Sequence, residues 1–250
     1  MSKSLKEYKS TIDGSYTLYS SEYDECYHST KDGALSESLY KHVIPAFSFA
    51  SSGDKLVILD ICFGLGYNAL ATIYYCIQND IKTELEIFSP ELDLNLVQSL
   101  KAFRYPIEFD ALRHIITALS EKQEYEDEHL KIKIIIGDAR ASIKEIDKEI
   151  DIIYQDPFSP KKNPTLWTRE YFEDIYALAS PSAVLTTYSV ATPVRLGLYE
   201  SGFYIYEYTS DHTRSGTIAS KRRLPLKLID MELKKQRNPK AKSLKDSEYQ

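Results

Sequence analysis

The stretch that decides the fold is Leu56-Val57-Ile58-Leu59-Asp60-Ile61-Cys62-Phe63-Gly64-Leu65-Gly66-Tyr67-Asn68. Its first six residues are apolar except for Asp60 and contain no Gly or Pro, which predicts a strand buried on both faces. The strand ends in a carboxylate, two glycines follow, and a helical pattern starts after Asn68. Glycines allow a ligand to approach the backbone and a helix start offers free N–H groups, so the stretch predicts a nucleotide pocket.

The turn differs from the common phosphate-binding turns. A dinucleotide site would have G-x-G-x-x-G, whereas this turn is G-x-G-x-N, and no Lys-Ser/Thr pair follows as in a P-loop. An acidic strand end before G-x-G suits S-adenosylmethionine, because a carboxylate can pair with its ammonium and backbone N–H groups with its carboxylate. The residues predicted to hold this cofactor here are Asp60, Cys62, Gly64, Gly66 and Asn68. A glycine-rich turn that binds nothing is the alternative interpretation.

Composition limits the class of protein. The chain has 250 residues, 43% of them hydrophobic and 27% charged, enough for one large domain or two small ones. The formal charge of −6 argues against a general nucleic-acid coat but leaves room for a local basic patch. We expect no transmembrane helix and no secretion signal, since long apolar runs are lacking. Three widely spaced cysteines favour reduced thiols, neither disulfides nor a metal site, and a cytoplasmic location.

Strand and helix patterns alternate along most of the chain. Residues 1–12 are polar and expected to be frayed, residues 17–19 predict a short strand, and residues 35–42 predict a helix that ends before Pro45. Residues 94–130 are expected to be helical. The apolar runs that predict strands of a main sheet are 56–61, 85–90, 132–136, 150–155, 183–188, 203–207 and 216–220. The pattern predicts a mainly parallel seven-stranded α/β sheet with helices on both faces and an antiparallel last strand.

Acidic residues follow several of these strands. Glu91 lies about 25 residues after the glycine-rich turn, where such folds place the carboxylate that takes both ribose hydroxyls, and Asp93 is the reserve candidate. Asp138 ends the next strand and could accept the adenine amino group, with the backbone of Ala139 reading the ring edge. Asp156 ends the strand after that. All of these residues should meet at the carboxyl edge of the sheet.

The sequence Asp156-Pro157-Phe158-Ser159-Pro160 resembles the D/N-P-P-Y/F motif of methyltransferases that act on amino groups. A nitrogen attacks a sulfonium methyl only with a free lone pair, and it gains positive charge as it does so. A carboxylate can hold the N–H groups and offset that charge. An aspartate with its usual pKa of about 3.9 is a weak base, so Asp156 is assigned to orientation and electrostatics.

The longer stretch from Asp156 to Trp167 resembles the D-x-F-x-P-x-K-N-P-x-x-W motif of the MnmC-type tRNA 5-methylaminomethyl-2-thiouridine methyltransferase family. Further matches are Glu25, Tyr27-His28-Ser29, Gly33-Ala34, Glu37, Phe63-Gly64, Gly66, Asn68, Ser89, Glu91, Gly137-Asp138, Thr187-Tyr188-Ser189, Val194-Arg195 and Gly202-Phe203. The resemblance runs from about Asp13 to Lys221. It implies a Rossmann-like class I fold that transfers methyl from S-adenosylmethionine to the aminomethyl nitrogen of 5-aminomethyl-2-thiouridine at the tRNA wobble position.

The resemblance also implies a set of substrate residues and partners. The substrate residues are Glu25, Tyr27, His28, Ser29, Phe158, Pro160, Lys162, Asn163, Trp167, Tyr188 and Arg195. Phe158 or Trp167 is expected to stack a flipped base in this loop. The alternative for Trp167 is a core aromatic, and that for His28 is a surface or capping histidine. The partner is the tRNA anticodon stem-loop. The bifunctional members also carry a flavin oxidase domain, for which this chain is too short, so we expect no flavin, no metal, and an oxidase or upstream enzyme elsewhere.

Three segments are expected: an N-terminal extension with a substrate-recognition loop over 1–50, the methyltransferase domain over 51–220, and a basic, partly flexible segment over 221–250. The basic segment either contacts a polyanion or is a solubilising end. Cys62 replaces the glycine usual in the turn and should remodel the methionine end of the pocket. The alternatives are an amino methyltransferase for DNA, protein or a small amine, and a tRNA- or protein-binding module on a decayed fold; the intact acids argue against decay. An aminopropyl transferase would need a denser glycine run.

Overall fold

The centre of the molecule is an eight-stranded sheet with the order β10-β11-β9-β8-β4-β5-β7-β6. The computed structural model describes residues 6–51 and 53–249. The strands are β4 (Lys55–Ile61), β5 (Glu84–Glu91), β6 (Glu124–Glu126), β7 (Leu130–Ile136), β8 (Ile150–Gln155), β9 (Ala179–Thr187), β10 (Tyr204–Tyr208) and β11 (Gly216–Ser220). Strands β7, β5, β4, β8 and β9 are parallel, and β11 is antiparallel to both β9 and β10. This is the predicted class I arrangement, to which β6 adds a short antiparallel edge strand in a charged segment expected to be helical or solvated.

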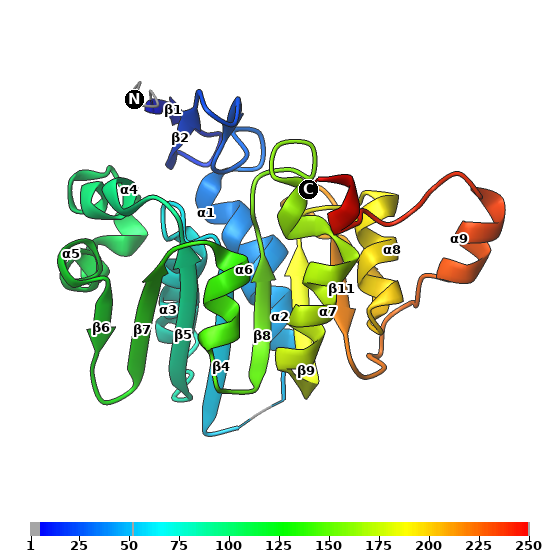
Figure 1. Cartoon of the computed structure of the whole chain (residues 1–250). Coiled ribbons are helices and arrows are strands. Elements are labelled where there is room, and N and C mark those ends of the chain that lie inside the picture. The colour runs from blue at the N-terminus through cyan, green and yellow to red at the C-terminus, as the bar shows by residue number, and fades with distance from the viewer. Residues whose placement is uncertain (1–5, 52, 250) are drawn as a thin grey trace.

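Helices cover both faces of this sheet (Figure 1). One face packs against α1 (Ala34–Glu37), η1 (Ser38–Val43), α2 (Ile44–Phe49), α3 (Tyr67–Gln78), α4 (Leu94–Ser99), η2 (Leu100–Ala102), η3 (Ile107–Leu112) and α5 (Arg113–Lys122). The other packs against α6 (Ala139–Ser142), η4 (Ile143–Glu145), η5 (Pro164–Trp167), α7 (Arg169–Leu178), α8 (Thr192–Glu200) and α9 (Met231–Arg237). In β4, Leu56 and Ile58 face the first layer while Leu59 and Ile61 face the second. The alternation of side chains along a strand therefore explains why the run is apolar throughout.

A second, three-stranded antiparallel sheet lies above the carboxyl ends of the main strands (Figure 1). It consists of β1 (Lys6–Ser10), β2 (Tyr16–Ser20) and β3 (Glu25–Cys26). The prediction of a short strand at 17–19 is confirmed. The prediction of a frayed start is wrong for residues 6–10, because β1 pairs along its whole length with β2 and Tyr8 stacks on Phe103 with ring centroids 5.3 Å apart. The first five residues lie outside the described part of the chain.

The predicted helix end before Pro45 is wrong, since helical structure continues from Ala34 to Phe49. The middle segment η1 is a π-helix, in which the Ile44 N–H donates to the carbonyl of Leu39. Pro45 occupies the first turn of α2, where a missing N–H costs little. The wider π turn thus admits a proline that would break a continuous α-helix.

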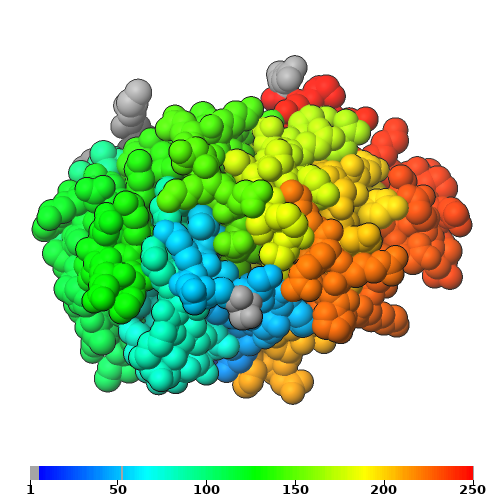
Figure 2. Space-filling model, turned by 90° about the horizontal axis from the view of Figure 1, so that it is seen from below, coloured from blue at the N-terminus to red at the C-terminus, as the bar shows by residue number. Residues whose placement is uncertain are grey.

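The C-terminal segment packs on the main domain. Leu244 forms a parallel bridge with Thr168, and Arg140 makes a two-pronged ion pair with Asp246 in η6 (Asp246–Glu248), with both N···O distances 2.6 Å. Seen from below, the segment lies along the flank opposite α5 (Figure 2). Among the described residues, no helix has the length and apolar character to cross a membrane.

Candidate active site

Two adjoining cavities lie at the carboxyl edge of the main sheet. The first, of about 420 Å³, is lined by Asp156 and by the N-terminal segment; we call it the Asp156 cavity. The second, of about 570 Å³, is lined by Glu91 and Asp138; we call it the Glu91 cavity. Tyr27, Cys62 and Phe158 line both. The acids predicted at successive strand ends are therefore brought together around two adjoining cavities.

Glu91 ties the glycine-rich turn to the next strand end. Its Oε2 accepts a hydrogen bond from the Gly64 N–H at 2.8 Å, and its Oε1 accepts one from the Asp93 N–H at 2.8 Å. Burial raises the pKa of this carboxyl above its usual value. Asp93 lines the same cavity but pairs with Lys6 and caps α4, so Glu91 is the better-placed candidate for a ligand hydroxyl.

The turn after β4 owes its shape to three residues in the left-handed backbone region: Cys62 (φ 66°), Gly64 (φ 55°) and Gly66 (φ 73°). Gly64 and Cys62 line the cavities. Gly66 lines neither, because a Cβ there would meet the Phe63 ring at 2.8 Å. The absence of a side chain at Gly66 makes room for Phe63, which lines the Asp156 cavity; the predicted approach of a ligand to the Gly66 backbone stays a prediction.

Asp60 is fully buried at the end of β4 and lines neither cavity directly. Its Oδ1 accepts a 3.3 Å hydrogen bond from Asn68 Nδ2, while its Oδ2 has no partner within the described residues. Burial, and next the nearby charge of Asp156, raise the pKa of Asp60 well above its usual value. Within the described chain, no Lys or Arg pairs with Asp60, Glu91 or Asp156. These three carboxyl groups, which have no basic side chain as a partner, suit a ligand that carries positive charge.

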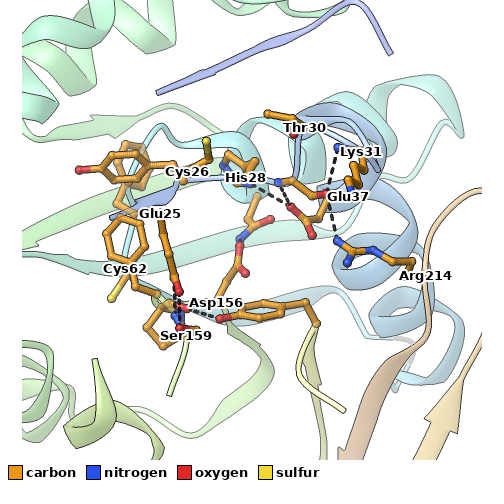
Figure 3. A pocket seen from close by; sticks show the side chains of 18 residues that line it. Glu25, Cys26, His28, Thr30, Lys31, Glu37, Cys62, Asp156, Ser159 and Arg214 are labelled. Carbon is orange, nitrogen blue, oxygen red and sulfur yellow. Dashed lines mark hydrogen bonds and ion pairs between the residues drawn. The ribbon is translucent and has the colours of Figure 1, made fainter. Parts of the chain in front are cut away.

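Asp156 lines its cavity with a side chain that is 8% exposed (Figure 3). Its Oδ2 accepts from Asn68 Nδ2 at 2.9 Å, and its Oδ1 lies 3.5 Å from Nε2 of the buried His42. The following loop is fixed by the Tyr188 hydroxyl, which donates to the Pro157 carbonyl at 2.9 Å. The carboxylate is therefore held by one hydrogen bond from Asn68, its loop is held by Tyr188, and it still reaches the cavity.

The N-terminal segment closes over this loop. Glu25 accepts hydrogen bonds from both the N–H and the hydroxyl of Ser159, as Figure 3 shows, and the N–H bond is 2.9 Å. The Tyr23 ring stacks on Phe158 with centroids 4.3 Å apart, and Tyr27 packs against the same ring at 4.9 Å. The predicted residues Glu25 and Tyr27 thus form a wall of the cavity that is far in sequence from Asp156.

The opposite wall is an ionic cluster. Glu37 accepts from the Ser29 N–H at 2.7 Å and from Lys41 at 2.9 Å, and its carboxylate lies 3.8 Å from the ring of His28. Hydrogen bonds and nearby cations hold the pKa of Glu37 far below its usual value despite burial. Arg214, from the β10–β11 loop, donates to the Ser29 hydroxyl. His28 and Ser29 therefore line the cavity as parts of a paired network.

Four predicted substrate residues line neither the Asp156 cavity nor the Glu91 cavity. Trp167 is 0% exposed, and its Nε1 donates to the Phe158 carbonyl at 2.8 Å, so its proposed role as a stacking surface is wrong and the core interpretation is correct. Arg195 is buried and donates to Thr217; it lines a third cavity, under α9. Pro160 and Lys162 line neither site cavity.

Other positions need a smaller adjustment. Asn163 lines the Glu91 cavity, not the Asp156 cavity. Tyr188 lines the Asp156 cavity as expected. Sequence reasoning missed His42 and Tyr23, which no local motif marks. The structure alone shows that a histidine in η1 reaches Asp156 and that an aromatic before β3 covers Phe158.

Comparison with known proteins identifies the family. The fold matches a crystal structure of MnmC2 from Aquifex aeolicus with a TM-score of 0.85 and 33% identity, over 99% of this chain and 81% of that one. This chain belongs to the MnmC-type methyltransferase family. A family model described as S-adenosyl-L-methionine-dependent methyltransferase matches residues 107–222. The protein is thus an MnmC-type methyltransferase that depends on S-adenosylmethionine.

Two curated relatives extend this picture. The tRNA 5-methylaminomethyl-2-thiouridine biosynthesis bifunctional protein MnmC of Azoarcus sp. is 31% identical over 202 residues, which is 76% of this chain and 31% of the relative. An uncharacterized protein of Methanocaldococcus jannaschii is 35% identical over 213 residues, covering 84% of this chain and 58% of the relative. The MnmC-type chain described here therefore spans about a third of the first relative and just over half of the second.

Proposed function

We propose that this MnmC-type methyltransferase transfers methyl from S-adenosylmethionine to the aminomethyl nitrogen of 5-aminomethyl-2-thiouridine at a tRNA wobble position. The observation that carries the proposal is Asp156, a carboxylate held by Asn68 at 2.9 Å on the wall of a cavity that adjoins the Glu91 cavity. The name of the Azoarcus relative contains the same modified nucleoside, 5-methylaminomethyl-2-thiouridine. A substrate amine and a sulfonium cofactor both match the acidic character of the two cavities.

The residues of the Glu91 cavity suit S-adenosylmethionine. From the Glu91 cavity, Glu91 would take its ribose hydroxyls and Asp138 with the backbone of Ala139 its adenine edge. Gly64, which lines the adjoining Asp156 cavity, would hold its amino-acid end, with the buried Asp60 acting from beside Asn68. The unpartnered Oδ2 of Asp60 supports this, because a buried carboxylate oxygen gains most from a cationic partner. When bound, the cofactor supplies an electrophilic methyl group.

Asp156 acts on the acceptor. An aliphatic amine reaches the site mostly as an ammonium ion, which must release one proton to water before the neutral amine can attack. The Asp156 carboxylate accepts a hydrogen bond from the amine, directs its lone pair, and offsets the positive charge that grows on nitrogen. Asn68 keeps the carboxylate in one orientation, since its amide donates to Oδ2.

The surfaces near the cavity suit a nucleotide taken out of its stack. Phe158 is lined up with Tyr23 and Tyr27 and offers an aromatic wall for a base, with Trp167 supporting it from the core. Arg214, 68% exposed in its side chain, lies at the same cavity and can meet a phosphate. A third cavity, which Lys227, Lys234, Arg237 and Arg195 line under α9, offers further phosphate contacts.

The proposal is tested by incubating tRNA that carries 5-aminomethyl-2-thiouridine with the protein and methyl-labelled S-adenosylmethionine. Nucleoside mass spectrometry should find the label in 5-methylaminomethyl-2-thiouridine, and an Asp156→Ala variant should give almost none. Parallel incubations replace the tRNA with DNA, protein or a small amine. Label in one of these substrates and none in the tRNA would contradict the proposal and favour the alternative substrate class.

A further inference from the structure

His42 is a buried side chain with an unmatched polar atom beside the reacting region. Its ring is 0% exposed, its Nδ1 lies 3.1 Å from the Thr186 hydroxyl, and its Nε2 lies 3.5 Å from Asp156 Oδ1. That Nε2 has no hydrogen bond within the described residues. A buried nitrogen left this close to a carboxylate is costly unless its proton points toward that oxygen.

The backbone places His42 there by an unusual route. It lies in the π-helical segment η1, next to Lys41, which turns to Asp32 and Glu37, and Val43, which packs in the core. A π turn spreads consecutive side chains differently from an α turn and is frequent at functional sites. The local structure therefore sends three neighbouring side chains to three destinations, of which His42 alone reaches Asp156.

The environment of the ring selects a proton position. The Thr186 side chain in β9 can donate its hydroxyl proton to Nδ1, which leaves the imidazole proton on Nε2 and directs it at Asp156 Oδ1. The Tyr154 ring packs against His42 edge-on at 5.8 Å and blocks rotation. Asn68 donates to Oδ2 of Asp156, and His42 Nε2 lies 3.5 Å from its other oxygen, Oδ1.

We propose that His42 is a positioning residue for methyl transfer: its Nε2–H fixes the Asp156 carboxylate, with Thr186 setting the tautomer. The proposal rests on the proposed function of Asp156 as the group that holds the acceptor amine. His42 does not touch the acceptor, so its loss should lower turnover and leave cofactor affinity alone. A carboxylate free to rotate would lose much of its catalytic effect.

Two variants of nearly equal size separate this role from simple packing. In His42→Gln the terminal amide nitrogen can occupy the place of Nε2 and still donate to Asp156. In His42→Asn the shorter amide can reach only the Thr186 side. We expect kcat of His42→Gln to stay within about threefold of wild type and that of His42→Asn to fall on the order of 10- to 100-fold. The cofactor dissociation constant and KM for tRNA should change little in both. Equal kcat values for the two variants would overturn the proposal.

A second measurement does not depend on turnover. Nitrogen-15 NMR of protein labelled at its five histidines reports whether each ring nitrogen carries a proton. The pair of ring-nitrogen signals that disappears in the His42→Asn variant belongs to His42. We expect a protonated Nε2 whose shift moves in Asp156→Asn, and an unprotonated Nε2 would overturn the proposal. Wild-type protein inactive on the tRNA but showing the expected Nε2–H would instead refute the proposed function alone.

Discussion

The amide nitrogen of Asn68 lies 2.9 Å from Asp156 Oδ2, so the first residues of α3 hold the carboxylate that ends β8. The same amide donates to Asp60 at 3.3 Å. One side chain therefore connects the glycine-rich turn, the strand that leads into it, and the acceptor loop.

The first prediction concerns Asp156 itself. Asp156→Ala should lower kcat by on the order of 100-fold, the scale seen when one preorganised electrostatic group is lost. Asp156→Asn should fall between this variant and wild type, because it keeps an acceptor and loses the charge. Affinity for S-adenosylmethionine, measured by titration calorimetry, should remain near wild type. Full turnover in the alanine variant would remove Asp156 from the mechanism.

The second prediction uses Gly66. Gly66→Val should weaken S-adenosylmethionine binding roughly tenfold or more, because its Cβ displaces Phe63 and its φ of 73° disfavours a branched side chain. Gly53→Val is the matched control, since a Cβ there meets nothing closer than 3.5 Å. Calorimetry on both variants decides the point, and equal affinity for the two would show that the turn tolerates the change.

The third prediction concerns the cysteine that replaces the usual glycine. Cys62 adopts a φ of 66°, which L side chains rarely take. Cys62→Gly should raise the free energy of unfolding by about 1 kcal/mol, whereas Cys62→Ala, which keeps the strain, should not. Urea unfolding followed by circular dichroism measures both. A glycine variant no more stable than the alanine variant would argue that the backbone at 62 is unstrained.

The fourth prediction follows from the raised pKa of Asp60. The folded state binds the Asp60 proton more tightly than the unfolded state, so this site contributes stability at low pH that is lost as pH rises from the ordinary pKa of about 3.8 toward the raised one. Asp60→Asn does not titrate. Its free energy of unfolding relative to wild type should therefore increase with pH, by up to about 1.4 kcal/mol per pH unit in that window.

Chemical unfolding of the two proteins without cofactor, from about pH 4 to pH 8, gives this slope. The exposed Asp54, changed to Asn, serves as the control for the loss of one carboxylate elsewhere in the chain. A flat difference for Asp60→Asn would mean that Asp60 titrates normally in the folded protein.

The fifth prediction addresses RNA contact by the basic segment. The structure makes truncation after Lys227 an unsuitable test, because it would also remove the Arg140–Asp246 ion pair. The double change Lys227→Ala with Lys234→Ala should instead weaken tRNA binding and reduce its salt slope by about two, one per lost phosphate contact. Lys122→Ala with Lys133→Ala, on the opposite flank, should leave the slope unchanged. Filter binding at several salt concentrations tests this, and equal slopes would return the segment to a solubilising role.

The local sequence pattern predicted the strands of the main sheet and the acidic residues at their ends. The apolar alternation of β4 and the spacing to Glu91, Asp138 and Asp156 fixed which strand ends meet, and all three acids line the cavities. The pattern does not predict whether the side chain of a motif residue points into the cavity or into the core. For this reason Trp167 is expected at the substrate, although the structure places it in the core.

Long-range contacts account for the other differences. His42 reaches Asp156 across 114 positions only because a π-helical turn precedes Pro45, and no composition signal marks such a turn. Arg195 matches a family motif, yet its guanidinium is directed by Thr217 on a neighbouring strand. Tertiary pairing decides where these side chains point, and it cannot be read from their own segments.

The wall shared by the two cavities has a consequence for the order of events in a catalytic cycle. Tyr27 and Phe158 border both spaces, and Glu25 bonds the segment that carries Tyr27 to Ser159 beside Phe158. Any excursion of that segment changes solvent access to both spaces at once. With cofactor and acceptor in these two spaces, as proposed above, we expect a change at Glu25 to alter the release rates of spent cofactor and methylated product together.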